Sequence, residues 1–203
     1  MKPSRKKGSC SSRASGSRLA PCLGREPRPA HEPVELIILV GIPASGKTTY
    51  FRRHLARRYA HVSLDNWRGK GNARGKEREA IIAALHAAAG ADTGEPPRGV
   101  VVDNTNVTAE TRRRYFQLAR AFQEQTGRTV KLIAYFFDVP LEDCLRRNER
   151  RPRNPPIGEP YHVPPAAIHR FQAQLEPPSG AEGFDEVLRV RIAPDGRFRV
   201  REQ

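Results

Sequence analysis

The apolar residues of this sequence form short continuous runs, separated by longer stretches in which they recur every three or four positions. Val34–Val40, Gly99–Val102 and Thr129–Phe137 are apolar over most of their length, which is typical of strands buried on both faces of a parallel sheet. His61–Leu64 is a shorter run of the same kind. We therefore expect at least four strands here, most of them parallel.

The intervening stretches have the apolar spacing of helices that pack on a sheet. Helices are predicted at 47–59, 76–89 and 166–175, with 69–75 as a loop. Two more helices begin after Thr108, which can serve as a cap, and at Pro140, where acidic residues in the first turn suit the helix dipole. Because strands and helices alternate, the predicted fold class is α/β, with a mostly parallel sheet and helices on both faces.

Two regions near the C-terminus depart from this pattern. Arg151–Pro165 is rich in proline and is predicted to be irregular, as part of a lid region at about 147–165. Val187–Ile192 and Arg197–Val200 flank a Pro-Asp-Gly turn, which predicts a C-terminal hairpin. Its arginines occupy alternate positions, which is more typical of a solvated sheet face than of a binding ridge. These arginines are Arg189, Arg191, Arg197, Arg199 and Arg201.

Residues 1–33 show neither pattern. They are rich in Ser, Arg, Pro and Gly, and carry eight lysines and arginines against two glutamates. Such a segment buries too little apolar surface to offset its ordering entropy, so we predict a disordered basic tail followed by one domain over 34–203. A basic, Ser-rich, acid-poor start is also compatible with an organelle transit peptide.

Composition bears on partners and location. The formal net charge of +14 favours acidic partners such as nucleic acids or nucleotides, although arginine-rich surfaces can simply be solvated. No apolar run approaches the roughly 20 residues of a membrane span, so no membrane partner is expected. Cys10, Cys22 and Cys144 do not suggest a disulfide framework or a zinc site, which favours a reducing, cytoplasmic location. The oligomeric state stays open.

A phosphate-binding loop follows the first strand. Residues 41–48 read GIPASGKT and match the motif G-x-x-x-x-G-K-[ST] in full. In such a loop backbone amides turn inward around phosphates, Lys47 binds the β- and γ-phosphates, and Thr48 binds Mg²⁺. The predicted nucleotide-binding residues are Gly41, Ala44, Ser45, Gly46, Lys47, Thr48 and Thr49. The motif indicates a P-loop NTPase-type three-layer sandwich that binds ATP and Mg²⁺.

An acidic residue ends the predicted strand at 100–103. Asp103 follows three valines and can hold Mg²⁺ through water. Asn104 occupies the position at which AAA-type and helicase ATPases usually carry a glutamate that activates water. The missing glutamate favours transfer to an acceptor over hydrolysis.

Further candidate residues follow the second strand and the fourth. Asp65 is predicted to be the general base that accepts the proton of an acceptor hydroxyl, with a helix cap as the alternative role. Arg68 is predicted to hold a phosphate of the acceptor. Arg147 and Arg151, spaced i, i+4 on a predicted helix face, are expected to bind the β- and γ-phosphates and stabilise the transferring group.

The segment Asn66–Lys76 combines four basic residues, no acid and Trp67. This composition suits a single-stranded nucleic-acid end, with a phosphate on arginine and a base on tryptophan. A flexible loop with Trp67 packed beneath it is equally compatible with the sequence.

Five segments, in order, resemble the kinase module of the polynucleotide 5′-kinase/3′-phosphatase family, from about residue 35 to 190. GIPASGKTT resembles the family's phosphate loop, HVSLDN its general-base segment, and VVVDNTN its Asp-Asn-Thr-Asn segment. FDVPLEDCLRRNERR resembles its lid helix, and HVPPAAIHRFQAQLEPPSGAEGFDEV its closing stretch. The resemblance implies ATP- and Mg²⁺-dependent phosphorylation of the 5′-hydroxyl end of DNA or RNA, with Asn106 among the substrate-binding residues.

The sequence departs from this family in lacking an Asp-x-Asp-Gly-Thr phosphatase motif, so 3′-phosphatase activity is not expected. Two other functions stay open. Related small P-loop kinases share the closing stretch and phosphorylate metabolites or groups bound to transfer RNA. An NTP-switched binding protein without transfer chemistry would also need the phosphate loop.

Overall fold

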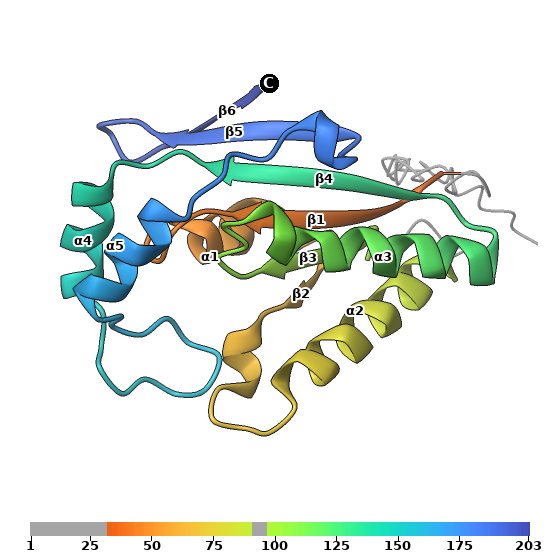
Figure 1. The fold of residues 1–203 in the computed structure, drawn as a ribbon, viewed down its shortest axis with the longest axis horizontal. Coiled ribbons are helices and arrows are strands. Elements are labelled where there is room, and N and C mark those ends of the chain that lie inside the picture. Colours follow the sequence, from red (N-terminus) through yellow and green to blue (C-terminus); the bar gives the residue numbers. More distant parts are fainter. Residues whose placement is uncertain (1–31, 91–96) are drawn as a thin grey trace, which may run out of the picture.

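A computed structural model describes residues 32–90 and 97–203, and within them the chain forms a six-stranded sheet in the order β2-β3-β1-β4-β5-β6 (Figure 1). The strands are β1 (Val34–Val40), β2 (Ala60–Val62), β3 (Gly99–Asp103), β4 (Val130–Phe137), β5 (Glu186–Ile192) and β6 (Phe198–Glu202). The first five are parallel, and β6 pairs antiparallel with β5. The predicted parallel sheet and terminal hairpin are both confirmed.

The helices connect these strands. They are α1 (Lys47–Tyr50), which continues into the wider turn η1 (Phe51–Leu55), then η2 (Leu64–Trp67), α2 (Ala73–Ala89), α3 (Ala109–Thr126), α4 (Leu141–Glu149), α5 (Pro165–Ala173) and η3 (Gly180–Glu182). The basic tail predicted at 1–33 lies almost wholly outside the described residues. Among the residues that are described, no helix is both long enough and apolar enough to cross a membrane.

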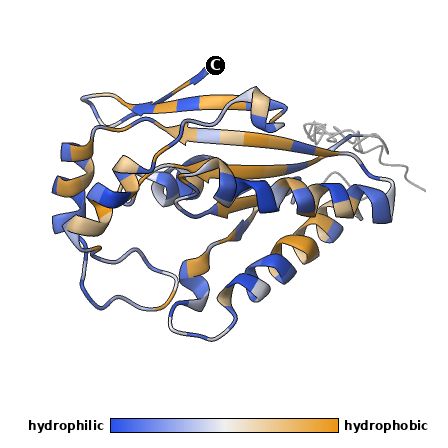
Figure 2. Ribbon diagram, in the orientation of Figure 1, coloured by the Kyte–Doolittle hydropathy of each residue, from blue (hydrophilic) through white to orange (hydrophobic). Residues whose placement is uncertain are grey.

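The sheet is buried between two helical layers, as the apolar runs predicted. Successive β1 residues point to opposite faces, so Leu36 and Ile38 pack with α2 and α3, whereas Ile37 and Leu39 pack with α1, α4 and α5. Figure 2 shows β1 and β4 largely in the colour of hydrophobic residues, consistent with burial on both faces. The predicted three-layer α/β sandwich is therefore correct.

Several predicted boundaries were wrong. The helix expected over 47–59 ends at Leu55, because the chain turns there to enter β2 at Ala60. The predicted loop at 69–75 is shorter, since α2 begins at Ala73 behind Asn72, whose side chain accepts a hydrogen bond from the Gly75 amide. The second strand ends at Val62, so Asp65 lies in η2 rather than directly at the strand end.

Candidate active site

The phosphate loop connects the end of β1 to α1 at the carboxyl edge of the sheet (Figure 1). Gly46 has φ 98°, a left-handed conformation that a residue with a side chain adopts only with strain. A Cβ at Gly41 would lie 3.0 Å from the Ser45 hydroxyl oxygen. The two glycines of the motif therefore allow the loop to fold tightly at the end of its strand, which is the geometry that a phosphate needs.

Lys47 is folded back onto the loop that carries it. Its ammonium donates hydrogen bonds to the carbonyl oxygens of Gly41 at 2.8 Å and Ile42 at 2.9 Å, and only 7% of the residue is exposed. Burial lowers the pKa of Lys47 to about 8, and the carboxylate of Asp103 opposes the shift. The cation is thus already positioned inside the loop.

Asp103 ends β3 beside the phosphate loop. Its Oδ2 accepts a hydrogen bond from the Thr48 hydroxyl at 2.6 Å and lies 3.1 Å from Nε2 of His61. Burial acts to raise the pKa of Asp103, but the hydrogen bond with His61, the charge of Lys47 and the hydrogen bond from Thr48 together hold it below its ordinary value. The carboxylate therefore stays ionised.

Thr48 and Asp103 form a donor set that fits Mg²⁺. Both supply hard oxygen atoms, and these oxygens are adjacent at the mouth of the loop. Mg²⁺ in phosphate sites takes one or two protein oxygens and completes its octahedron with water and substrate phosphates. The described residues contain no group of three or more His, Cys, Asp or Glu that could hold a metal ion, so any metal held here would depend on such outside ligands.

Asp65 lies across a cavity of about 230 Å³ from the phosphate loop. The cavity is lined by Pro43, Ala44, Lys47, Thr48, Leu64, Asp65, Asp103, Asn104, Thr105, Arg151, Pro160, Tyr161, Val163 and Phe171. Burial, followed by the nearby charge of Asp103, raises the pKa of Asp65, while Arg68 and Arg151 oppose the shift. The alternative capping role belongs to Ser63, whose hydroxyl accepts from the Asp65 amide at 3.3 Å. The Asp65 carboxylate thus remains available to the cavity.

The two predicted phosphate-binding arginines separate in the structure. Arg151 lines the cavity and donates to the Tyr161 carbonyl at 3.5 Å. It follows the end of α4 at Glu149, so the expected helical i, i+4 pair does not form. Arg147 lies on α4 and does not line the cavity, although its buried Nη1 has no hydrogen-bond partner among the described residues. Only Arg151 is brought to the site directly.

Arg68 is engaged elsewhere than predicted. Its guanidinium donates to the carbonyl oxygens of Pro155 at 3.3 Å and Pro156 at 3.4 Å, and it lies 4.3 Å from the ring centroid of Tyr161. These contacts hold the irregular segment 150–164 against η2, and the predicted binding of an acceptor phosphate by Arg68 stays a prediction. Trp67 is half-buried and packs against the core beside α2, which favours the packed alternative for this residue.

Asn106 and Thr49 also lie outside the cavity. The Asn106 side chain is buried, donates to the Leu39 carbonyl at 3.0 Å and accepts from the Tyr115 hydroxyl at 3.0 Å. Both polar atoms of its side chain are thus bonded within the fold, and its predicted contact with substrate stays a prediction. Thr49 is exposed on α1 and does not line the cavity.

The segment 150–164 covers the cavity, in the region predicted to be a lid. The Gly158 amide donates to the backbone carbonyl of Asp65 at 3.1 Å. At the other end, the Asn148 side chain donates to the Val163 carbonyl at 2.7 Å and accepts from its amide at 2.9 Å. This segment is thus fixed both to the candidate base and to the last turn of α4.

Sequence reasoning missed three residues of the site. His61 lies on β2, Asn104 directly follows β3, and these two strands are paired. Asn104 accepts from the Leu64 amide at 2.8 Å and so fixes the start of η2, a structural task that differs from that of a water-activating glutamate. Tyr161 lines the cavity from the lid. A polar residue within or directly after an apolar strand was the available signal for the first two.

Comparisons with known proteins agree with this geometry. Residues 36–178 match the family model described as an AAA domain. A curated relative, the bifunctional polynucleotide phosphatase/kinase of Schizosaccharomyces pombe, is 26% identical over 77% of this chain, which spans 33% of the relative.

Solved structures share the fold. A fungal RNA kinase is 20% identical with a TM-score of 0.52, over 79% of this chain and 76% of that one. Chaetomium thermophilum Kti12 in complex with ADP-AlF3 is 18% identical with a TM-score of 0.51, over 77% and 88%. A putative kinase of Chloroflexus aurantiacus is 19% identical with a TM-score of 0.51, over 79% and 89%. Because the family model covers residues 36–178, the chain belongs to the AAA domain family.

Proposed function

We propose that this chain is an ATP- and Mg²⁺-dependent kinase that transfers the γ-phosphoryl group to the 5′-hydroxyl end of a nucleic acid. One observation carries the proposal. Asp65, a carboxylate with a raised pKa, faces the same cavity as Lys47 and Thr48 of the phosphate loop. A group that accepts protons is therefore opposite the groups that bind a triphosphate, as in-line transfer requires.

The donor side is formed by the loop and its neighbours. Lys47 and the loop amides bind the β- and γ-phosphates, exchanging the carbonyl contacts of the ammonium for phosphate oxygens. Thr48 and Asp103 would hold Mg²⁺, which would neutralise charge on the phosphate oxygens. Arg151 reaches the cavity from the lid end and stabilises the charge that spreads over the transferring group.

The acceptor side is formed by Asp65. Its carboxylate accepts the proton of the acceptor hydroxyl as that oxygen bonds to the γ-phosphorus. The bond from the γ-phosphorus to the bridging oxygen of the β-phosphate breaks, and ADP leaves with the electron pair. Burial keeps the pKa of Asp65 above its ordinary value, which strengthens it as a proton acceptor.

Three observations support a nucleic acid as the acceptor. The net charge of +14 favours a polyanion. The curated relative is named a polynucleotide phosphatase/kinase, and one structural neighbour is an RNA kinase. A small-molecule acceptor is the second candidate, because the cavity of about 230 Å³ is covered by the lid and would suit a compact alcohol.

One experiment separates these acceptors. The chain is incubated with Mg²⁺, γ-labelled ATP and a panel of 5′-hydroxyl DNA and RNA oligonucleotides, with the 5′-phosphorylated forms as controls and a crude metabolite extract in parallel. Label on the 5′-hydroxyl oligonucleotides alone supports the proposal. Label only in the metabolites would assign a small-molecule kinase, and release of free phosphate without a labelled acceptor would contradict transfer chemistry altogether.

A further inference from the structure

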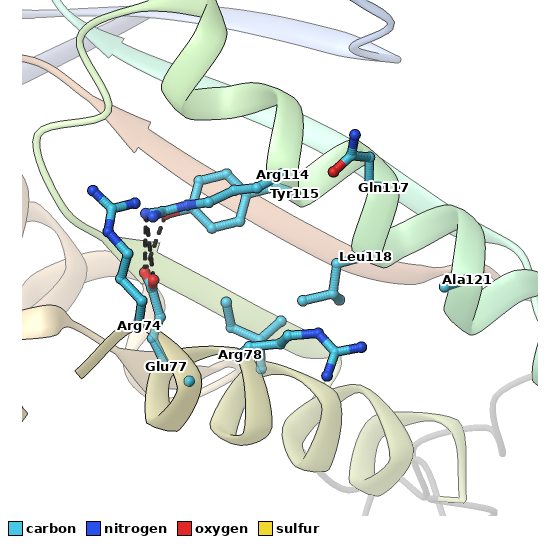
Figure 3. Close-up of a pocket in the computed structure, with 10 residues that line it drawn as sticks. Arg74, Glu77, Arg78, Arg114, Tyr115, Gln117, Leu118 and Ala121 are labelled. Carbon is cyan, nitrogen blue, oxygen red and sulfur yellow. Dashed lines mark hydrogen bonds and ion pairs between the residues drawn. The ribbon is translucent and has the colours of Figure 1, made fainter. Parts of the chain in front are cut away.

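A second hollow, of about 500 Å³, lies between α2 and α3 on the face of the sheet away from α1 (Figure 3). We call it the α2–α3 groove. Arg74 and Arg78 line it from α2, and Arg114 lines it from α3. Apolar side chains form its floor, namely Ile81, Leu118 and Ala121. The groove therefore combines cationic walls with an apolar base.

The positive charge of the groove is largely unpaired. Glu77 is the acidic residue of the lining, and it is buried and bonded to Asn104, Tyr115 and Arg114. Arg114 uses its Nη2 for these contacts, while its Nε and Nη1 are buried without a hydrogen-bond partner among the described residues.

Arg74 and Arg78 form no ion pair or hydrogen bond within 32–90 and 97–203. Both lie on the exposed side of α2, at the entrance of the groove. Two unpaired guanidinium groups on α2, across the groove from Arg114 of α3, are complementary to an anion that lies between the helices, and arginine matches the geometry of phosphate oxygens.

The apolar floor adds a second requirement for the ligand. A free phosphate would satisfy the arginines and leave the aliphatic surface of Ile81 and Leu118 uncovered. A nucleotide unit satisfies both, because its phosphate binds arginine and its base packs on an apolar or guanidinium surface. The hollow continues into a smaller one of about 50 Å³ that shares Arg78, Leu118 and Ala121, so its surface extends along the two helices.

A single residue joins the groove to the active site. Asn104 lines the catalytic cavity, and its amide donates to Glu77 Oε1, which lines the groove. The two hollows thus lie on either side of one hydrogen bond. A nucleic-acid chain with its end in the catalytic cavity would therefore have the groove next to it, on the other side of this hydrogen bond.

We propose that the α2–α3 groove binds the single-stranded nucleic acid that follows the acceptor 5′ end, with phosphodiesters on Arg74, Arg78 and Arg114 and a base on the floor. This inference rests on the proposed function, since it assumes a nucleic-acid acceptor. It predicts that affinity for the acceptor rises with strand length beyond the first nucleotides.

The test uses the double variant Arg74→Ala/Arg78→Ala in the full chain. Neither arginine side chain has a partner among the described residues, so the fold is expected to persist, and an unchanged thermal midpoint checks this. Arg57→Ala/Arg113→Ala removes the same charge from exposed positions outside the groove and serves as the control. Each protein is assayed with a 5′-hydroxyl dinucleotide and with a ten-nucleotide strand.

The groove variant should lower kcat/KM for the longer strand at least about tenfold and change that for the dinucleotide less than twofold. Two lost phosphate contacts should also reduce the salt dependence of binding, by about 1.4 in the slope of log K against log salt for a single strand. The control variant should change neither. An equal loss of kcat/KM for both acceptors, or the same loss in the control variant, would contradict the proposed role of the groove.

Binding without ATP gives an independent readout. Fluorescence anisotropy of a labelled ten-nucleotide strand should show weaker binding to the groove variant than to the control. If no oligonucleotide becomes phosphorylated, the proposed kinase function fails, yet this binding difference still supports the groove. If phosphorylation occurs and the two variants bind alike, the groove fails and the kinase function stands.

Discussion

At the scale of single residues, two carboxylates in one cavity have pKa values that are shifted in opposite directions. Asp103 is the more deeply buried, yet hydrogen bonds and the nearby cation keep its pKa below the ordinary value. Asp65 is only partly buried, and desolvation together with the charge of Asp103 raises its pKa. Paired groups whose surroundings separate their pKa values can divide the work, one holding a metal and the other moving a proton.

Asp65→Asn should lower kcat by about 10² to 10⁴, the usual contribution of a general base, while ATP still binds. A raised folded-state pKa means that ionised Asp65 destabilises the fold at neutral pH, and that this cost is relieved as pH falls towards that pKa. The variant should therefore unfold at no lower temperature than the parent. Turnover, ATP affinity and the thermal midpoint check these points, and an unchanged turnover would remove Asp65 from the mechanism.

The lowered pKa of Lys47 predicts that nucleotide binding depends on pH. With a pKa of about 8, the free side chain is mostly charged at pH 7 and mostly neutral at pH 9, whereas the triphosphate favours the charged form. ATP affinity should therefore be about tenfold weaker at pH 9 than at pH 7. Calorimetry in buffers of different ionisation enthalpy should detect proton uptake on binding above pH 8, and binding without uptake would contradict the prediction.

At the scale of elements, one side chain attaches the lid to α4. Asn148 bonds both the amide and the carbonyl of Val163, and it is 1% exposed. Its position in the last turn of α4 joins the irregular segment to a regular helix. The lining that Pro160, Tyr161 and Val163 give to the catalytic cavity therefore depends on this attachment.

Asn148→Ala should lower the free energy of unfolding by roughly 1–3 kcal/mol, because it leaves polar backbone groups of Val163 without their partner. Trypsin should also cleave faster after Arg153 in the loosened segment. Glu149→Ala, at the next and exposed position of the same helix, is the control. Equal cleavage rates in the two variants would show that Asn148 does not hold the lid.

The elements also show what the sequence could and could not predict. Strands buried on both faces were readable from their apolar runs, and the phosphate loop was readable because its residues are contiguous. The helix over 47–59 was predicted too long, since nothing local marks the turn into β2. The sequence did not show that Asn104 lines the cavity while Asn106, two residues on, donates to the Leu39 carbonyl. Contacts between distant segments, such as His61 with Asp103, needed the strand order.

At the scale of the whole molecule, the proposed donor site predicts a change in global stability. Mg²⁺-ATP at about 100 times its Kd should raise the free energy of unfolding by about 2.7 kcal/mol. Lys47→Ala should lose most of this effect, because the loop then lacks its cation. Thermal unfolding measures this stabilisation, with AMP as the control ligand, since AMP lacks the β- and γ-phosphates. Equal stabilisation by AMP would place the affinity outside the phosphate loop.

The C-terminal hairpin touches the phosphate loop at the opposite end of the domain's sequence. A Cβ at Gly46 would lie 3.3 Å from Ile192 Cδ1 and 3.4 Å from Phe198 Cε1, and Phe198 packs edge-on to Tyr50 of α1 at 5.1 Å between centroids. During synthesis the loop leaves the ribosome well before β5 and β6, which support it from outside. Capture of nucleotide in its final geometry must therefore wait for the closing strand, so ligand binding reports that assembly of the sheet is complete.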